Sequence, residues 1–131
     1  MTTPAATATS AGLRAQLLDA LAAVDPSDQE WRLAAACRDA DPRQFHPEWG
    51  SGRGDVDRAL ALCRRCPVKV PCLRVALDNI EDRSDLKDSG VFGGTVPRQR
   101  RRMRAAWAAR RADATARAAT RTAALAMEVM R

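Results

Sequence analysis

The sequence is poor in large aromatic side chains. Its 131 residues include no Tyr, two Phe and three Trp. Much of the 46% hydrophobic content is Ala, which buries little area per residue, so an ordinary apolar core would be thin. The length suits one domain and is too short for two well-packed ones. A thin core is commonly stabilised by a cross-link, and four cysteines are available for one.

Long apolar segments are also absent. The N-terminus has no basic start, and the apolar stretch 13–24 is interrupted by Arg14, Gln16 and Asp19, so it does not resemble a secretory signal. No run approaches the length that spans a bilayer. We therefore expect a cytoplasmic protein with no membrane contact. Because disulfides are rare in the reducing cytosol, the clustered cysteines favour a metal site.

The patterns of common enzymes are missing as well. The chain has one His, and we find no Gly-rich phosphate loop, no paired carboxylates in a plausible pocket and no nucleophile–base pair. We therefore do not expect an enzyme.

Apolar residues recur at helical spacing, and no stretch alternates as a β-strand does. We expect an all-α fold of about four short helices. Residues 1–10 should be a disordered lead-in, 11–96 the domain and 97–131 a basic helix or tail. The first two helices are expected at about 13–24 and 28–38, and the third begins at Asp55. Pro71 and Pro97 lie in the first turns of the two helices that follow.

Local patterns refine this expectation. Ser27 and Glu30 resemble a capping box for the helix 28–38, which would place Leu33 and Cys37 on one face. In the next helix, Cys63 shares a face with apolar residues and should point inward. Three Gly within residues 90–94 imply positive φ angles and a tight turn.

Positive charge is concentrated near the C-terminus. The formal net charge is +6, yet residues 97–131 hold 10 Arg against only Asp113 and Glu128. A basic segment on a near-neutral domain is typical of a nucleic-acid contact, here with phosphates rather than base edges. The alternative is a solvated helix start. The candidate DNA-binding residues are Arg98, Arg100, Arg101, Arg102 and Arg104.

The cysteines are spaced Cys37-x25-Cys63-x2-Cys66-x5-Cys72. A C-x2-C pair turns two sulfurs toward one centre, and Cys72 closes the site from the next helix. Cys37 must come from a distant segment, so the site would connect separate helices and contribute folding energy. Four thiolates suit zinc and an iron-sulfur cluster equally by number, and four unrelated buried cysteines are a third interpretation.

Four motifs in order resemble the WhiB-like family of actinobacteria and their phages. The resemblance covers about residues 30–105. Its motifs are EWR at 30–32 with ACR at 36–38, DP at 41–42 with Phe45 and Pro47, CRRCPV at 63–68 with CL at 72–73 and AL at 76–77, and GVFGG at 90–94 followed by a basic stretch.

The resemblance implies one 4Fe-4S cluster per chain, held by the four cysteines and sensitive to oxygen and nitric oxide. It implies a monomer that docks on region 4 of the primary sigma factor of RNA polymerase and contacts promoter DNA. Trp31 and Phe92 would pack beside the cluster. The implied sigma-facing residues are Phe45, Pro47, Gly90, Val91, Phe92, Gly93 and Gly94, next to Trp31.

Two residues depart from the family pattern. His46 stands where many relatives have a second Phe, and Phe92 replaces the usual Trp, so an indole N–H is lost. Two other functions stay open. One is a zinc-stapled interaction module without a redox role. The other is a thiol-disulfide reductase using Cys63 and Cys66, although the βαβ setting of such enzymes is missing.

Overall fold

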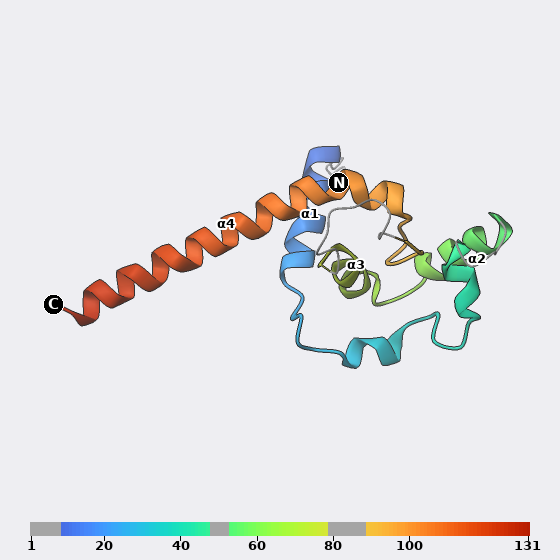
Figure 1. Cartoon of the computed structure of the whole chain (residues 1–131), viewed down its shortest axis with the longest axis horizontal. Coiled ribbons are helices and arrows are strands. Elements are labelled where there is room, and N and C mark those ends of the chain that lie inside the picture. Colours follow the sequence, from blue (N-terminus) through green and yellow to red (C-terminus); the bar gives the residue numbers. More distant parts are fainter. Residues whose placement is uncertain (1–8, 48–52, 79–88) are drawn as a thin grey trace, which may run out of the picture.

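The computed structural model describes residues 9–47, 53–78 and 89–131. Residues 1–8 of the expected lead-in lie outside these ranges. The elements are α1 (Ser10–Ala22), α2 (Arg53–Arg64), α3 (Lys69–Asp78) and α4 (Pro97–Val129), with the short 3-10 helices η1 (Glu30–Ala34) and η2 (Pro42–Phe45) between α1 and α2 (Figure 1). Within the described ranges the only β pairing is an isolated bridge between Phe92 and Thr95. The predicted all-α fold is confirmed.

Helix α1 begins at Ser10, which was expected to be the last residue of the lead-in. The Thr9 hydroxyl oxygen accepts a hydrogen bond from the Gly12 backbone N–H at 3.0 Å and caps the first turn. Leu17 and Leu18 pack against the core and Leu21 is fully buried, as the periodicity predicts.

The prediction of one α-helix over 28–38 is wrong. The Ser27 hydroxyl donates to the Asp25 carboxylate at 2.7 Å instead of capping a helix, and the Glu30 N–H donates to Asp28 at 2.9 Å. The chain forms only η1, which ends where Ala35 becomes extended. Leu33 is 65% exposed, so it does not share an inner face with Cys37. Short-range hydrogen bonds from Asp and Ser side chains compete with the α-helix here.

Helices α2 and α3 follow the sequence pattern closely. Helix α2 begins at Arg53, two residues before the predicted start at Asp55, which lies in its first turn. Ala59 and Cys63 are buried, which confirms the predicted inner face. Pro71 lies in the first turn of α3 as predicted.

Helix α4 is 33 residues long and begins at Pro97, where the Gln99 side chain accepts the Val96 N–H at 3.0 Å. Figure 1 shows its C-terminal half running away from the domain. Trp107 in its first half is only 4% exposed and belongs to the core. The domain therefore extends into α4, beyond the expected boundary at residue 96. No described helix combines the length and apolar character that a membrane crossing requires.

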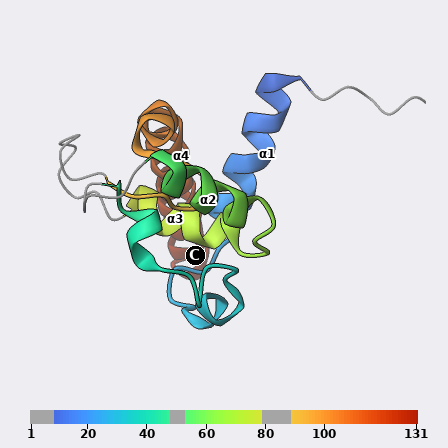
Figure 2. The same ribbon diagram turned by 90° about the vertical axis from the view of Figure 1, so that its right-hand side faces the viewer.

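The apolar side chains form two separate cores. The first, which we call the helical core, joins α1, α3 and α4 through Leu21, Leu73, Leu77 and Trp107. The second, which we call the cavity-side core, joins η2, α2 and residues 90–94, which we call the glycine-rich turn. It consists of Phe45, Ala59, Cys63 and Val91. The segment with η1 and η2 (cyan) lies on the side of α3 opposite α4 (Figure 1, Figure 2).

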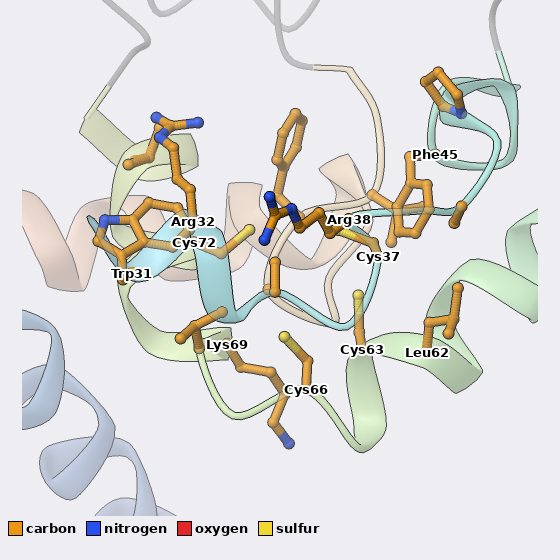
Figure 3. A pocket seen from close by; sticks show the side chains of 18 of the residues that line it. Trp31, Arg32, Cys37, Arg38, Phe45, Leu62, Cys63, Cys66, Lys69 and Cys72 are labelled. Carbon is orange, nitrogen blue, oxygen red and sulfur yellow. The ribbon is translucent and has the colours of Figure 1, made fainter. Parts of the chain in front are cut away.

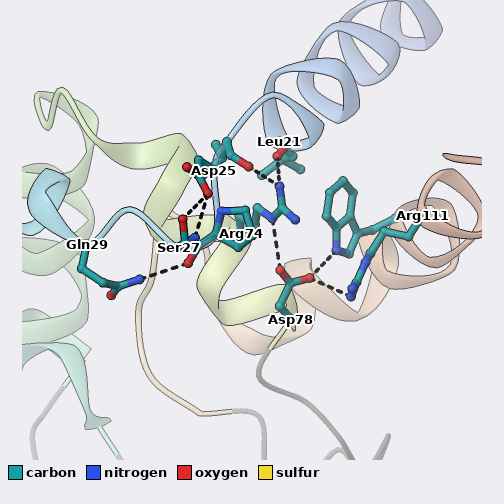
Figure 4. A network of polar contacts seen from close by, with 10 residues as sticks. Leu21, Asp25, Ser27, Gln29, Arg74, Asp78 and Arg111 are labelled. Carbon is teal, nitrogen blue, oxygen red and sulfur yellow. Dashed lines mark hydrogen bonds and ion pairs between the residues drawn. The ribbon is translucent and has the colours of Figure 1, made fainter. Parts of the chain in front are cut away.

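A polar network fastens the helical core (Figure 4). Arg74 on α3 donates to the Leu21 and Val24 carbonyl oxygens at the end of α1, and to the Asp78 carboxylate at 3.1 Å. Asp78 also accepts from Trp107 Nε1 and from Arg111, each at 3.0 Å. These bonds satisfy carbonyl groups that a helix end leaves open, and they join three helices.

Candidate metal centre

All four cysteines line one cavity of about 450 Å³. Figure 3 shows their sulfurs arranged around a common space. Cys37 lies in the turn after η1, Cys63 in the last turn of α2, Cys66 in the α2–α3 connection and Cys72 in the first turn of α3. All four are free thiols. The structure thus brings Cys37 to the other three across a long sequence separation.

The environment of the sulfurs disfavours free thiolates. Burial raises the pKa of Cys72 to about 11, and the Gly93 backbone N–H opposes this by hydrogen bonding to the sulfur. Burial also raises the pKa of Cys63, against a hydrogen bond from the Gly94 backbone N–H. The neighbouring cysteines raise the pKa of both thiols further, because like charges repel. Four thiolates therefore need a cationic centre between them.

The four thiols line a space that has room for a group larger than one ion, because the cavity has a volume of about 450 Å³. Thiolate ligands suit soft metals, and sets of four cysteine thiolates hold iron-sulfur clusters. The donor set and the cavity both fit a 4Fe-4S cluster.

The glycine-rich turn closes one side of this cavity. Gly90, Gly93 and Gly94 have φ angles of +81°, +56° and +75°, as the sequence predicts. A Cβ on Gly93 would lie 2.6 Å from the Leu73 Cβ and 2.7 Å from the Lys69 carbonyl oxygen. Gly93 therefore allows the backbone to approach α3 closely enough for its amide to reach Cys72.

Aromatic rings and cations complete the lining. Trp31 and Phe92, which the resemblance would place beside a cluster, both line the cavity. The Arg32 guanidinium lies 4.8 Å from the Trp31 ring centre. His46 packs edge-on to Phe92, with ring centres 6.0 Å apart. Three basic residues that sequence patterns did not predict also line the cavity, namely Arg32, Arg38 and Lys69. Their positions beside the cysteine motifs are the signal that would have indicated them.

Two expected partner-facing side chains are buried instead. Phe45 is 9% exposed and Val91 is 3% exposed, because both pack into the cavity-side core. Gly90 is buried too, since the Val91 N–H donates to the Phe45 carbonyl oxygen at 2.8 Å and draws the turn inward. Of the expected set, Trp31, Pro47, Phe92, Gly93 and Gly94 keep partly exposed positions.

The basic cluster divides into two faces of α4. Arg98, Arg101 and Arg102, which we call the outer arginines, are exposed, whereas Arg104 is half-buried. Arg100 is fully buried at 0% exposure, so its proposed contact with DNA is wrong. Its guanidinium is instead bound to backbone carbonyl groups of the glycine-rich turn.

Comparisons with known proteins match these features to one family. Residues 31–103 match the family model "Transcription factor WhiB". The chain is 41% identical over 88 residues to transcriptional regulator WhiB1 of Bifidobacterium longum, covering 65% of this chain and 89% of that protein. It is 39% identical over 77 residues to WhiB1 of Mycobacterium tuberculosis, covering 57% and 84%. It is 38% identical over 85 residues to WhiB of Streptomyces coelicolor, covering 63% and 87%. The chain therefore belongs to the WhiB family of transcription factors, as the motifs around its four cysteines predict.

Proposed function

We propose that this protein is a cytoplasmic transcription regulator that holds one 4Fe-4S cluster through Cys37, Cys63, Cys66 and Cys72. The observation that carries the proposal is the convergence of four free thiols from separate segments on one cavity. The cluster would supply a redox- and nitric-oxide-sensitive group. The proposed activity is regulatory and not enzymatic.

The protein's own residues have distinct roles in this proposal. Trp31 and Phe92 limit the access of solvent to the sulfurs, and the Gly93 and Gly94 amides donate to them. The cluster would also have a structural role, because Cys63 belongs to the cavity-side core while Cys72 lies on α3 beside the helical core. Binding it would connect the two cores.

We further propose that the partly exposed surface of Trp31, Pro47 and Phe92 docks on region 4 of the primary sigma factor, as a monomer. These side chains lie at or beside the cavity, so the surface depends on the cavity being filled. Aromatic residues in such positions are typical of the centres of interfaces. The outer arginines, on the exposed side of α4, would contact promoter DNA phosphates.

The first test is metal analysis of protein purified without oxygen. We expect a brown protein with about four iron and about four sulfide per chain. Cys72→Ser should lose the colour, and Cys37→Ser should lose it equally although it lies in a distant segment. A colourless wild-type protein with stoichiometric zinc and no iron would refute the cluster and leave the zinc-stapled module.

The second test is anaerobic co-expression with sigma region 4. We expect a coloured one-to-one complex on size exclusion, lost in Cys72→Ala and weakened in Trp31→Ala. Leu125→Ala, at an exposed residue far along α4, is the matched control and should leave the complex intact. A Trp31→Ala protein that keeps its cluster and binds sigma as the wild type does would refute the proposed surface.

The reductase alternative finds no support in the site. A reactive thiol of that kind has a lowered pKa, whereas burial raises the pKa of Cys63.

A further inference from the structure

Arg100 is the one charged residue that is fully buried among the described residues. Burying a guanidinium is costly unless its donors are satisfied. Nη1 donates to the Thr95 carbonyl oxygen at 2.8 Å and to the Thr95 hydroxyl at 3.0 Å. Nη2 donates to the Gly90 carbonyl oxygen at 2.7 Å and to the Ser89 carbonyl oxygen at 3.2 Å. The side chain thus binds both ends of the segment 89–95.

The segment 89–95 is also held from within and from its other side. Phe92 and Thr95 exchange backbone hydrogen bonds of 3.0 and 2.9 Å, and the Arg100 guanidinium lies 5.5 Å from the Phe92 ring centre. On the other side, Gly93 contacts α3, and a Cβ on Gly94 would lie 3.7 Å from the Cys63 Cβ. The turn therefore lies between Arg100 and the two sulfurs of Cys63 and Cys72.

We propose that Arg100 is a positioning residue for the metal centre. By binding the carbonyl groups at Gly90 and Thr95, it holds the turn so that the Gly93 and Gly94 amides face the sulfurs of Cys72 and Cys63. Hydrogen bonds to ligand sulfur set the potential and the stability of a cluster. The inference rests on the proposed function for the identity of the centre. Arg100 is assigned a role that it exerts through the turn and not by direct contact with the sulfurs.

The planar guanidinium suits this role better than an ammonium group. Its donors form a rigid fork, and here two nitrogens bind acceptors from opposite ends of one turn. Lys carries its three donors on a single nitrogen, which cannot occupy the positions of Nη1 and Nη2 at the same time. Arg100→Lys should therefore keep the buried charge and lose the fixed spacing of the turn, while Arg100→Gln should lose both.

The test uses the anaerobically purified, cluster-loaded full chain. The variants are Arg100→Lys and Arg100→Gln, with Arg121→Gln as the control, because Arg121 lies exposed on the same helix. We expect the visible absorption of Arg100→Gln to decay about tenfold faster in air than that of the wild type. Its midpoint potential should fall, because fewer amide donors stabilise the reduced cluster. Arg100→Lys should lie between the two, and Arg121→Gln should match the wild type.

A second readout reports the turn directly. Amide hydrogen exchange at Gly93 and Gly94 should be faster in Arg100→Gln, while amides of the helical core around Leu77 stay protected. If Arg100→Gln does not yield folded protein, Arg100→Lys is the variant to measure, because it keeps the buried charge and changes only the spacing of the donors, and it should show the same changes to a smaller extent. The role of Arg100 would be overturned if the folded variants matched the wild type in three quantities: the rate at which the visible absorption decays, the midpoint potential, and the rate of amide hydrogen exchange at Gly93 and Gly94. A colourless wild-type protein would instead refute the proposed function, so the two failures are distinguishable.

Discussion

Replacing Trp107 by Phe removes one hydrogen-bond donor from the polar network that joins α1, α3 and α4. Trp107 is 4% exposed, and its Nε1 donates to the Asp78 carboxylate at 3.0 Å. A hydrogen bond to a charged group is worth about 1.5–3 kcal/mol, and we take the lower part because 22% of the Asp78 side chain is exposed. The smaller ring leaves a partial cavity worth about 1–2 kcal/mol. We expect a total loss of roughly 2–4 kcal/mol.

For a chain of this length, such a loss lowers the thermal midpoint by roughly 8–16 °C. The assay is far-UV circular dichroism of the loaded protein under anaerobic conditions. One fixed scan rate is needed, because loss of the cluster would make unfolding irreversible. Asp78→Asn should lower the midpoint as well, since Asp78 also accepts from Arg74 and Arg111.

The double variant separates the hydrogen bond from the packing. Trp107→Phe combined with Asp78→Asn should cost about 1 kcal/mol less than the two single changes added together, because both act on the same bond: the first removes its donor and the second removes the charge on its acceptor. Asp113→Asn is the control, since its ion pair with Arg117 lies between exposed side chains and should contribute little. Strictly additive midpoints, or a Trp107→Phe shift no larger than that of the control, would contradict the assigned role of the network.

Three further predictions concern the turn, the core and α4. Gly93→Ala should lower the free energy of unfolding, measured with denaturant, by about 3 kcal/mol or more, because the φ angle of Gly93 is positive and the new Cβ meets Leu73. Gly54→Ala, in open space on α2, should instead raise it by about 0.5–1 kcal/mol. Leu77→Ala should cost about 2–5 kcal/mol, while Leu125→Ala, 62% exposed, should change the same measurement little. Changing the three outer arginines to Gln should reduce the salt dependence of promoter binding, measured by fluorescence anisotropy, by a slope of about 2–3; an unchanged slope would remove them from the DNA contact.

The sequence predicted those parts of the fold that depend on local signals. Pro71 and Pro97 mark helix starts because their fixed φ suits a first turn and they lack the N–H that would be unsatisfied there. The glycines at 90–94 indicated positive φ angles for steric reasons. The inward face of α2 followed from apolar periodicity, which placed Cys63 correctly.

The errors arose where tertiary or competing contacts decide. The capping box at Ser27 was outweighed by a bond between that hydroxyl and Asp25. Arg100 looked like its exposed neighbours in a basic run, and only the position of the glycine-rich turn beside α4 turns it inward. Phe45 was expected at the sigma-facing surface because the family resemblance implies it, and an isolated aromatic in a loop gives no indication in the sequence of the core that it joins. Helix periodicity assigns residues to faces, but it does not reveal what a loop will cover.

The position of the proposed metal centre explains how a small change there could reach α4. Helix α2 packs mainly on η2, and α1, α3 and α4 pack on one another. The cavity lies between these two units, with Cys63 on one and Cys72 on the other. Arg100 adds a second connection, since it belongs to α4 and binds the turn that faces both cysteines. If the proposed cluster is lost, the thiolates of Cys63 and Cys72 take up protons, because burial raises their pKa, and the Gly93 and Gly94 amides then donate to neutral thiols, which are weaker acceptors. The turn that Arg100 binds is then held less firmly, and Arg100 is adjacent to the outer arginines in α4, so we expect the proposed DNA contact and the proposed cluster to be coupled through α4.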